Sequence, residues 1–417
     1  MTEDMPGTAW LLASGALVWL MPAGLALLAT GLTRGKNAVH TAFMPFIGSA
    51  VAVLGSWLCG FAVMDRGTTL ARHLDELPGG YALFFWRTAL VCVVVSIPTG
   101  ALAERWRLKN LLAYSLFVSC LLFPSFAAWT WGDGWLARLG VTCRLGVGFV
   151  DFAGAGVVHV VGGLSALAGA VVLGPRLGRY SREGGLVPIP AHNVPLALLG
   201  SFLLAVGWLG FNIGPTPDAP GRVATVTILA GAAGAVAAAA YMVFTTHKPD
   251  PTITINGLLA GLVSSSASAA FIAPTAAVIL GTIAGLLICL SVRLFDKARV
   301  DDPVGAISVH GVGGLWGVLA AGIFAHSGPV NGCLYGGWGQ LGAQVVGALA
   351  LVLWAFGLAW VFFKIINRFI PMRVAPEVEM EGLDISETGL MGYPTDGHLS
   401  AFSSGFASAA RKNSRGE

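Results

Sequence analysis

The sequence predicts an all-α integral membrane protein with eleven transmembrane helices, an inverted repeat of five plus five helices followed by one extra helix. Three observations support this fold class. Of the 417 residues, 55% are hydrophobic and only 11% are charged, which is too little polar surface to cover a soluble globule. Eleven apolar runs are each long enough to cross a bilayer. One seven-residue phrase also occurs in two of these runs.

A transmembrane helix needs roughly 20 mostly apolar residues. The runs that meet this criterion cover, in chain order, residues 9–33, 40–64, 81–103, 110–131, 147–173, 194–214, 223–245, 253–271, 274–294, 305–325 and 341–365. The first run is too long for the apolar core of a signal peptide, and Glu3 and Asp4 precede it instead of basic residues. We therefore expect it to remain in the mature protein.

The repeated phrase is VHVVGGL at 158–164, in the fifth run, and VHGVGGL at 309–315, in the tenth run. Six of its seven positions are identical, and the copies are 151 residues and five spans apart. An odd number of spans reverses orientation, so this offset is typical of an inverted-topology repeat, spans 1–5 against spans 6–10. Span 11 has no counterpart, and we expect it to brace the outside of the bundle.

Lys and Arg sort by loop, and their excess marks the cytoplasmic side of a membrane protein. If the N-terminus is outside, the inner loops hold about twelve basic residues and the outer loops five. The C-terminal tail is then cytoplasmic, in agreement with its own Lys364, Arg368 and Arg373. We expect a multi-pass protein of the inner or plasma membrane, embedded in the lipid bilayer, with its N-terminus outside and its C-terminus in the cytoplasm.

The chain divides into a transmembrane domain, residues 1–370, and a cytoplasmic tail, residues 371–417. The tail is rich first in Glu and then in Ser, Ala and Gly, and we expect disorder from about residue 395. The net charge of +3 is explained by the inner loops and gives no reason to expect nucleic-acid binding. Cys143 and Cys333 fall in or beside outer loops and could pair, although the sequence does not place them within bridging distance.

Each copy of the phrase places a histidine, His159 or His310, inside an apolar span. An ionisable residue in the membrane is costly and points to function. A single histidine of this kind is more often a packing residue, but two at repeat-related positions favour a functional pair. Two neutral imidazoles can hydrogen-bond and still offer a narrow polar seam to a small solute. Desolvation and mutual repulsion should keep the pair neutral at pH 7, or with one shared proton.

A metal centre is a poor alternative interpretation of this pair. It would have two nitrogens and no nearby thiol, and the nearest carboxylate, Asp151, should lie about 12 Å from His159 along the helix axis. Zinc takes three or four ligands. We therefore expect no metal, no other cofactor and no enzymatic activity.

Two residues near the outer side each have two interpretations. Asp151 stands at the start of span 5, where a helix N-cap is the favoured role and a carboxylate that shapes the outer mouth is a compatible one. Trp131 lies with Trp129 and Trp135 at the outer end of span 4. This cluster is either part of the interfacial aromatic belt or the wall of a vestibule that holds a small cation on a π-face.

Several motifs, in order and across nearly the whole chain, resemble those of the ammonium transporter (Amt/Mep/Rh) family. Besides the two histidine phrases they are 31–37 (GLTRGKN), 100–105 (GALAER), 129–132 (WTWG), 151–154 (DFAG), 207–212 (GWLGFN) and 301–303 (DDP). The resemblance implies a homotrimer of eleven-helix protomers. Each protomer would have its own hydrophobic pore for ammonium or ammonia, lined by His159 and His310.

The resemblance also implies roles for residues outside the histidine pair. Trp131 matches the tryptophan that holds the cation, Asp151 the structural aspartate near the recruitment site, and Phe211 one of two stacked gate phenylalanines. The cytoplasmic tail of the family packs across the inner face of the trimer and is addressed by regulatory PII-type proteins. The residues that match this tail are Glu381, Gly382, Leu383 and Asp384.

The outer mouth departs from the family pattern at three positions. The second gate phenylalanine falls on Leu90, and the hydroxyl that helps to bind the cation is replaced by Pro215. Arg87 adds a charge inside a span near the same mouth. These departures predict weaker capture of ammonium, whereas the histidine seam is intact.

We therefore expect an ammonium transporter. A bare cation in a low-dielectric pore costs several kcal/mol, so the physics favours recruitment of NH4+ outside, deprotonation at the mouth and passage of NH3, with or without its proton. The main alternative, which the altered mouth motivates, is an ammonium-binding sensor or receptor with little flux.

Overall fold

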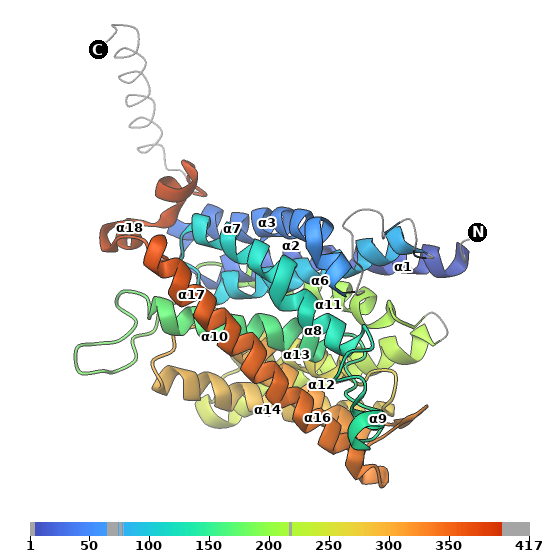
Figure 1. Cartoon of the computed structure of the whole chain (residues 1–417). Coiled ribbons are helices and arrows are strands. Elements are labelled where there is room, and N and C mark those ends of the chain that lie inside the picture. The colour runs from blue at the N-terminus through green and yellow to red at the C-terminus, as the bar shows by residue number, and fades with distance from the viewer. Residues whose placement is uncertain (1–4, 65–73, 75–76, 78, 217–218, 394–417) are drawn as a thin grey trace, which may run out of the picture.

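The computed structural model describes residues 5–64, 74, 77, 79–216 and 219–393, so the expected disorder beyond about residue 395 lies outside the described residues. The fold is almost entirely helical (Figure 1). The longer elements, with the π-helical segments labelled η, are α1 (Met5–Val18), α2 (Leu20–Leu32), α3 (Ala38–Gly55), η2 (Ser56–Gly60), α4 (Phe61–Met64), α6 (Gly80–Ala101), α7 (Leu108–Phe117), η3 (Val118–Leu122), α8 (Phe123–Thr130), α9 (Leu139–Cys143), η4 (Ala155–Val160), α10 (Val161–Leu173), α11 (Val194–Ile213), α12 (Pro220–Thr246), α13 (Pro251–Ser265), α14 (Pro274–Lys297), η5 (Ile307–Val312), α15 (Gly313–Phe324), α16 (Trp338–Leu351), η7 (Val352–Gly357), α17 (Leu358–Phe369), α18 (Pro376–Glu381) and η8 (Asp384–Thr388). Two short antiparallel strands, β1 (His326–Ser327) and β2 (Val330–Asn331), form a hairpin.

Ten segments in the described part of the chain are long and apolar enough to cross a membrane, which confirms the fold class. The remaining predicted span, 253–271, is represented by α13, which has only 15 residues and is roughly 22 Å long. The helix ends at Ser265, and the chain continues in turns from Ser266. Backbone amides of Phe152 and Ala153 then bond the carbonyls of Ala267 and Ser266.

The predicted start of span 5 at residue 147 is also wrong, because the helix begins at Ala155. The preceding segment turns at three glycines with positive φ, including Gly154 at +113°, a backbone conformation that glycine adopts without strain. Apart from Asp151, residues 147–153 carry no charged or polar side chain, so hydropathy alone cannot separate this irregular segment from the helix.

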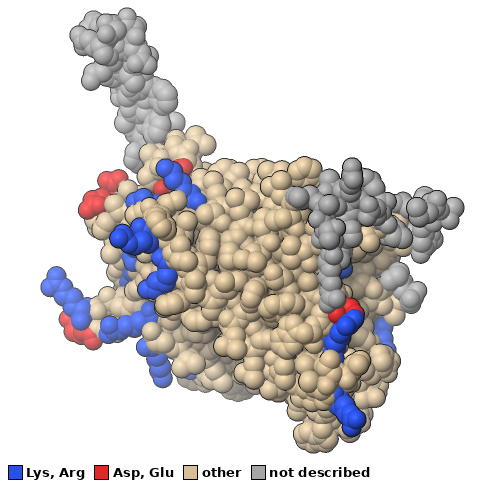
Figure 2. Space-filling view, in the orientation of Figure 1, with Lys and Arg blue, Asp and Glu red and all other residues tan. Residues whose placement is uncertain are grey.

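The segment Trp338–Phe369, formed by α16, η7 and α17, crosses the outside of the bundle obliquely (Figure 1). Only 22% of its most apolar stretch is buried, against 83% in Ala155–Leu173. This is the brace that the sequence predicted for span 11. Figure 2 shows charged side chains gathered at two ends of the visible face, with a wide uncharged band between them that suits a lipid bilayer.

The two repeat phrases contact each other, and in each contact a glycine of one phrase faces a residue of the other. A Cβ atom at Gly163 would collide with the backbone of Gly311, and one at Gly314 would lie 2.7 Å from the side chain of Val160. Gly163 and Gly314 are equivalent positions of the repeat, as are Val160 and Gly311, so the two contacts are related by the same pseudo-two-fold axis. The absence of side chains at these glycines lets the two helices, and therefore the two histidines, approach each other.

Candidate functional site

The two histidines form one contact at the crossing of the repeats. His159 lies on η4 and His310 on η5, and their Nδ1 atoms are 3.2 Å apart. The ring centres are 5.2 Å apart and the planes differ by 24°. Both side chains are buried, with 0% and 3% of their surface exposed. Because a neutral imidazole has one donor and one acceptor nitrogen, this geometry suits one Nδ1 that donates and one that accepts.

Two aromatic rings pack against the imidazole of His159. Trp208 stacks on it at a centroid distance of 4.9 Å and Phe211 at 5.0 Å. Both rings belong to α11, and the Trp208 indole is fixed by a 3.1 Å hydrogen bond to the hydroxyl of Ser266. Phe211, which the family resemblance proposes as a gate residue, is therefore in direct contact with one histidine of the pair. Sequence reasoning missed Trp208, although it stands one turn before Phe211.

A carboxylate precedes each histidine-bearing segment, the buried Asp151 before η4 and the half-buried Asp302 before η5. Asp151 accepts hydrogen bonds from the amides of Gly156 and Val157, at 2.9 and 2.7 Å. Asp302 accepts one from Ile307 at 2.7 Å, and its other oxygen accepts from Val304 and Gly305. The Asp151 carboxylate thus caps the first turn, in line with the favoured prediction, but Asp151 stands four residues before Ala155 and the N-cap position itself is held by Gly154. Asp302 was missed as its counterpart, although each aspartate precedes its histidine by eight residues.

Trp131 lies at the end of α8, where its indole N–H donates to the carbonyl of Asp151 at 2.7 Å. This bond sets the orientation of the ring at the start of η4. Phe123 meets the same ring edge to face at 6.3 Å. Trp131 is half-buried, so one part of its surface remains accessible.

The three departures from the family pattern lie on or near the same two helices. Leu90 is fully buried on α6, and an aliphatic side chain there cannot stack on Phe211. The half-buried Arg87 guanidinium lies 5.9 Å from the ring centre of Phe61. Pro215 is exposed just after α11, and the next hydroxyl, that of Thr216, is buried without a hydrogen-bond partner among the described residues.

A narrow cavity adjoins His310 and is otherwise mostly apolar. It leaves about 10 Å³ free, close to the space that one water molecule needs. Asn256 and Val304 line this cavity and also a wider one of about 180 Å³, which contains the polar side chains Arg176 and Asp302. The cavity beside His310 and the wider cavity therefore share part of one wall, and we call the wider one the polar vestibule.

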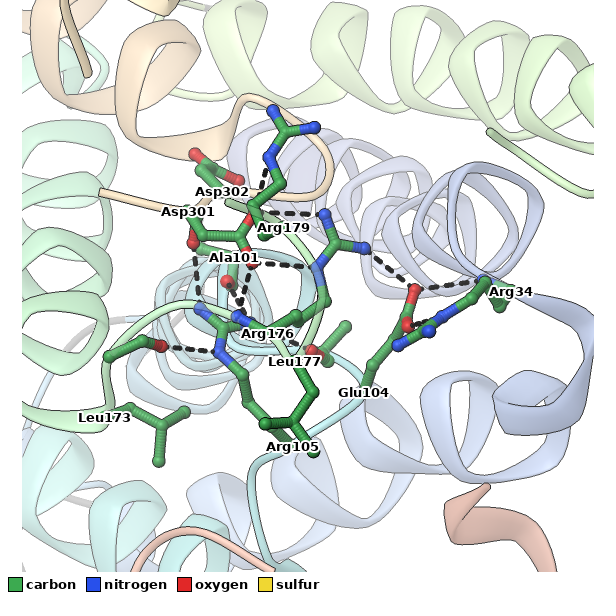
Figure 3. A network of polar contacts seen from close by, with 12 residues as sticks. Arg34, Ala101, Glu104, Arg105, Leu173, Arg176, Leu177, Arg179, Asp301 and Asp302 are labelled. Atoms are coloured by element: carbon green, nitrogen blue, oxygen red, sulfur yellow. Dashed lines mark hydrogen bonds and ion pairs between the residues drawn. The ribbon is translucent and has the colours of Figure 1, made fainter. Parts of the chain in front are cut away.

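A buried ion-pair network borders this vestibule (Figure 3). Arg176 donates to Glu104 at 2.9 Å and to Asp301 at 2.8 and 3.0 Å, while Arg34 pairs with the other end of Glu104. Arg105 is fully buried and donates to the carbonyl of Asp301 at 2.8 Å. Although burial opposes ionisation, the neighbouring guanidinium groups hold the pKa of Asp301 well below its usual range. The network joins three loops of the first repeat, which the sequence predicts to be inner loops, to a loop of the second repeat.

The tail lies against the same inner loops. Three of its carboxylates each accept a hydrogen bond from a backbone amide, Glu379 from Leu177 at 2.7 Å, Asp384 from His40 at 2.9 Å and Glu387 from Leu108 at 2.9 Å. These bonds satisfy backbone donors that an inner loop and the first turns of α3 and α7 leave unpaired. The ammonium group of Lys36 in turn donates to the carbonyls of Glu379 and Met380.

The four tail residues singled out from the sequence form the turn at the centre of this contact. Glu381 ends α18, and Gly382 has φ +117°, a conformation that a side chain would strain. Leu383 is fully buried and its amide donates to Asn37 at 2.9 Å. Asp384 begins η8.

The burial of Asp151 predicts a pH-dependent stability. Burial raises the pKa of Asp151 from 3.8 to about 6, although the amides at the start of η4 oppose the shift. Between these values the folded state binds more protons than the unfolded state, so stability should fall as pH rises from about 4 to about 6, by about 3 kcal/mol. Asp151→Asn should remove this loss. Melting curves of both proteins in detergent would test it, and parallel pH profiles of the two melting temperatures would contradict it.

Known proteins are similar to this chain in sequence and in fold over most of its length. The sequence profile of the Ammonium Transporter Family matches residues 9–393. Ammonium transporter Amt2 of Archaeoglobus fulgidus is 40% identical over 410 residues, which cover 92% of this chain and 87% of that protein. A solved structure named Sensor Amt Protein superimposes with a TM-score of 0.86 at 33% identity, covering 92% of this chain and 98% of that one. Mep2 of Candida albicans has a TM-score of 0.80 at 27% identity, covering 90% and 87%. The chain therefore belongs to the ammonium transporter family.

Proposed function

We propose that this protein, which transports ammonium as a member of its family, recruits NH4+ at the outer mouth, removes a proton there and conducts NH3 between His159 and His310. The contact of 3.2 Å between the two buried imidazoles carries this proposal. The rings around the pair are apolar, so a bare cation would lose its hydration at a cost of several kcal/mol. Neutral ammonia is similar to water in size, and the cavity beside His310 has room for about one water molecule.

Ammonium-evoked current and methylammonium uptake in reconstituted vesicles would test this function. We expect saturable uptake that discriminates ammonium from potassium, because potassium cannot give up a proton at the mouth. A current that accompanies uptake would mean that the proton follows the ammonia. Uptake equal to that of protein-free vesicles would refute transport.

A second candidate function is ammonium sensing with little flux. The substituted outer mouth, with Pro215 in place of a hydroxyl, favours weak capture. The likeness to Sensor Amt Protein adds a structural precedent for such a role. The same vesicle assay separates the two functions when it is combined with a binding measurement, because a sensor would bind ammonium without appreciable uptake.

Trp131 is proposed to hold the cation at the mouth. Its ring is oriented by the bond to the Asp151 carbonyl, and a cation on a π-face is stabilised by about 0.5–2 kcal/mol. Trp131→Leu should therefore raise the half-saturating ammonium concentration, by about two- to thirtyfold, more than it lowers the maximal rate. Trp129→Leu, in the same aromatic cluster, is the matched control. An unchanged concentration dependence in Trp131→Leu would assign the ring to the aromatic belt.

We further propose that the protein forms a homotrimer in the plasma membrane, with the N-terminus outside. The cytoplasmic tail would act as a docking element, and the protein would have no enzymatic activity. The excess of basic residues in the proposed inner loops supports the orientation. Three carboxylates hold the tail against the rest of the protein, and this supports its role as a segment that an intracellular PII-type partner could bind or displace from these contacts. Copurification of such a partner with the full chain, but not with Asp384→Arg, would support this role.

A further inference from the structure

Two cysteines meet on the second and fourth spans, which carry neither pore histidine. The thiols of Cys59, on η2, and Cys120, on η3, are both free and half-buried. Both contact one oxygen, the carbonyl of Gly55, at 3.7 and 3.6 Å, and the Cys59 thiol also lies 4.0 Å from the carbonyl of Cys120. The two thiols therefore share one acceptor, the carbonyl oxygen of Gly55, at the contact between the two spans.

Two glycines beside Cys59 allow the second span to approach the fourth closely. A Cβ atom at Gly60 would collide with the carbonyl of Ser119, and one at Gly55 would collide with the Ser119 hydroxyl. Both cysteines also lie in π-helical segments, which are rare and concentrate at functional sites. The contact between the two spans thus depends on small residues beside each cysteine.

The pair is accessible from the lipid. The exposed large side chains beside the two cysteines are all apolar, with 43% to 48% of their surface exposed, and they are Trp57, Leu58, Leu116 and Leu121. The thiols are therefore accessible to a species that crosses the hydrocarbon region. Water-soluble ions that need many oxygen ligands would not reach them.

We propose that Cys59 and Cys120 together bind one thiophilic d10 metal ion of the Cu(I), Ag(I) or Hg(II) class in two-coordinate geometry. Soft thiolate ligands select such ions. Zinc needs three or four ligands, and the described residues contain no group of three or more His, Cys, Asp or Glu that could hold a metal. Two metal–sulfur bonds of about 2.3 Å in a line would place the sulfurs about 4.6 Å apart, a separation that two thiols on one carbonyl oxygen can reach by side-chain rotation. Binding breaks both S–H bonds and releases two protons to solvent, with no change of oxidation state.

The test uses the full chain in detergent with only this pair of cysteines retained, after replacement of Cys92, Cys143, Cys289 and Cys333 by serine. Mercuric chloride serves as the probe because the neutral molecule enters lipid and micelles. Intact-mass measurement should find one mercury per chain, two protons lost and no chloride retained. Such a product requires one ion bridged by both sulfurs.

Single variants in this background complete the test. With Cys59→Ser or Cys120→Ser, the mercury bridge should disappear, and any mercury adduct should retain one chloride. If serine perturbs the contact between the helices, Cys59→Ala serves in its place and should give the same result. Competition with a Cu(I) chelator should show at least tenfold weaker binding in each single variant. A second protein that retains only Cys92 and Cys289, whose thiols bond separate carbonyls, is the matched control and should form no bridge. Two chloride-bearing adducts on the Cys59/Cys120 protein, or no mercury at all, would overturn the proposal.

Discussion

Replacement of either pore histidine by alanine is expected to reduce ammonium transport by about ten- to a hundredfold. In His159→Ala the Nδ1 atom of His310 loses its partner at 3.2 Å, and in His310→Ala the reverse holds. A buried polar group without a partner costs about 1–3 kcal/mol. If ammonia must pass between the two histidines, this cost adds to the activation free energy of transport. Uptake and current in vesicles measure the effect, and selectivity for ammonium over potassium should fall together with the rate.

The matched control for this prediction is His40→Ala. His40 is buried on α3, outside the pair, and its side-chain nitrogens have no hydrogen-bond partner among the described residues. This variant shows whether the loss of any buried imidazole lowers transport. We expect transport to stay near the level of the unsubstituted protein. Unchanged rate and selectivity in both single pore variants would show that the histidine seam is not the transport path.

The central pair could be predicted from the sequence because it is encoded twice. Two copies of one phrase, separated by an odd number of spans, determine both the crossing of the helices and the meeting of His159 with His310. The same internal symmetry could have identified Asp302, since it precedes His310 by the distance that separates Asp151 from His159. Hydropathy failed only where apolar residues are not helical, as in the segment before Ala155.

The outer mouth could be predicted only in part. Phe211 was identified by the family resemblance, but its stacking on His159 and the second ring of Trp208 are properties of how α11 packs against η4. No periodicity indicates such contacts between distant segments. Likewise, the partner of Trp131 is a backbone carbonyl, which has no signature in the residue types.

The ion-pair network was not predictable from residue patterns, because its members are charges in four separate loops. Glu104, Arg176 and Asp301 are 72 and 125 residues apart along the chain, yet both carboxylates bond one guanidinium. Both carboxylate side chains have 0% of their surface exposed, and that of Arg176 has 4%. Such pairs offset a large desolvation cost only while each charge keeps its partners. Loss of a single member therefore costs much more than loss of a surface ion pair.

Glu104→Ala is expected to destabilise the protein by about 3–5 kcal/mol, because it leaves the buried Arg176 with one carboxylate fewer and removes the partner of Arg34. The melting temperature in detergent should fall markedly. Glu104→Gln, which keeps the shape and one acceptor oxygen, should recover part of the loss. Arg138→Gln is the matched control, since its pair with Asp133 is exposed on both sides, and such surface pairs contribute little. If Glu104→Ala and Arg138→Gln lower the melting temperature equally, the inner network does not hold the repeats together, and the vestibule beside Asp301 must be maintained by apolar packing alone.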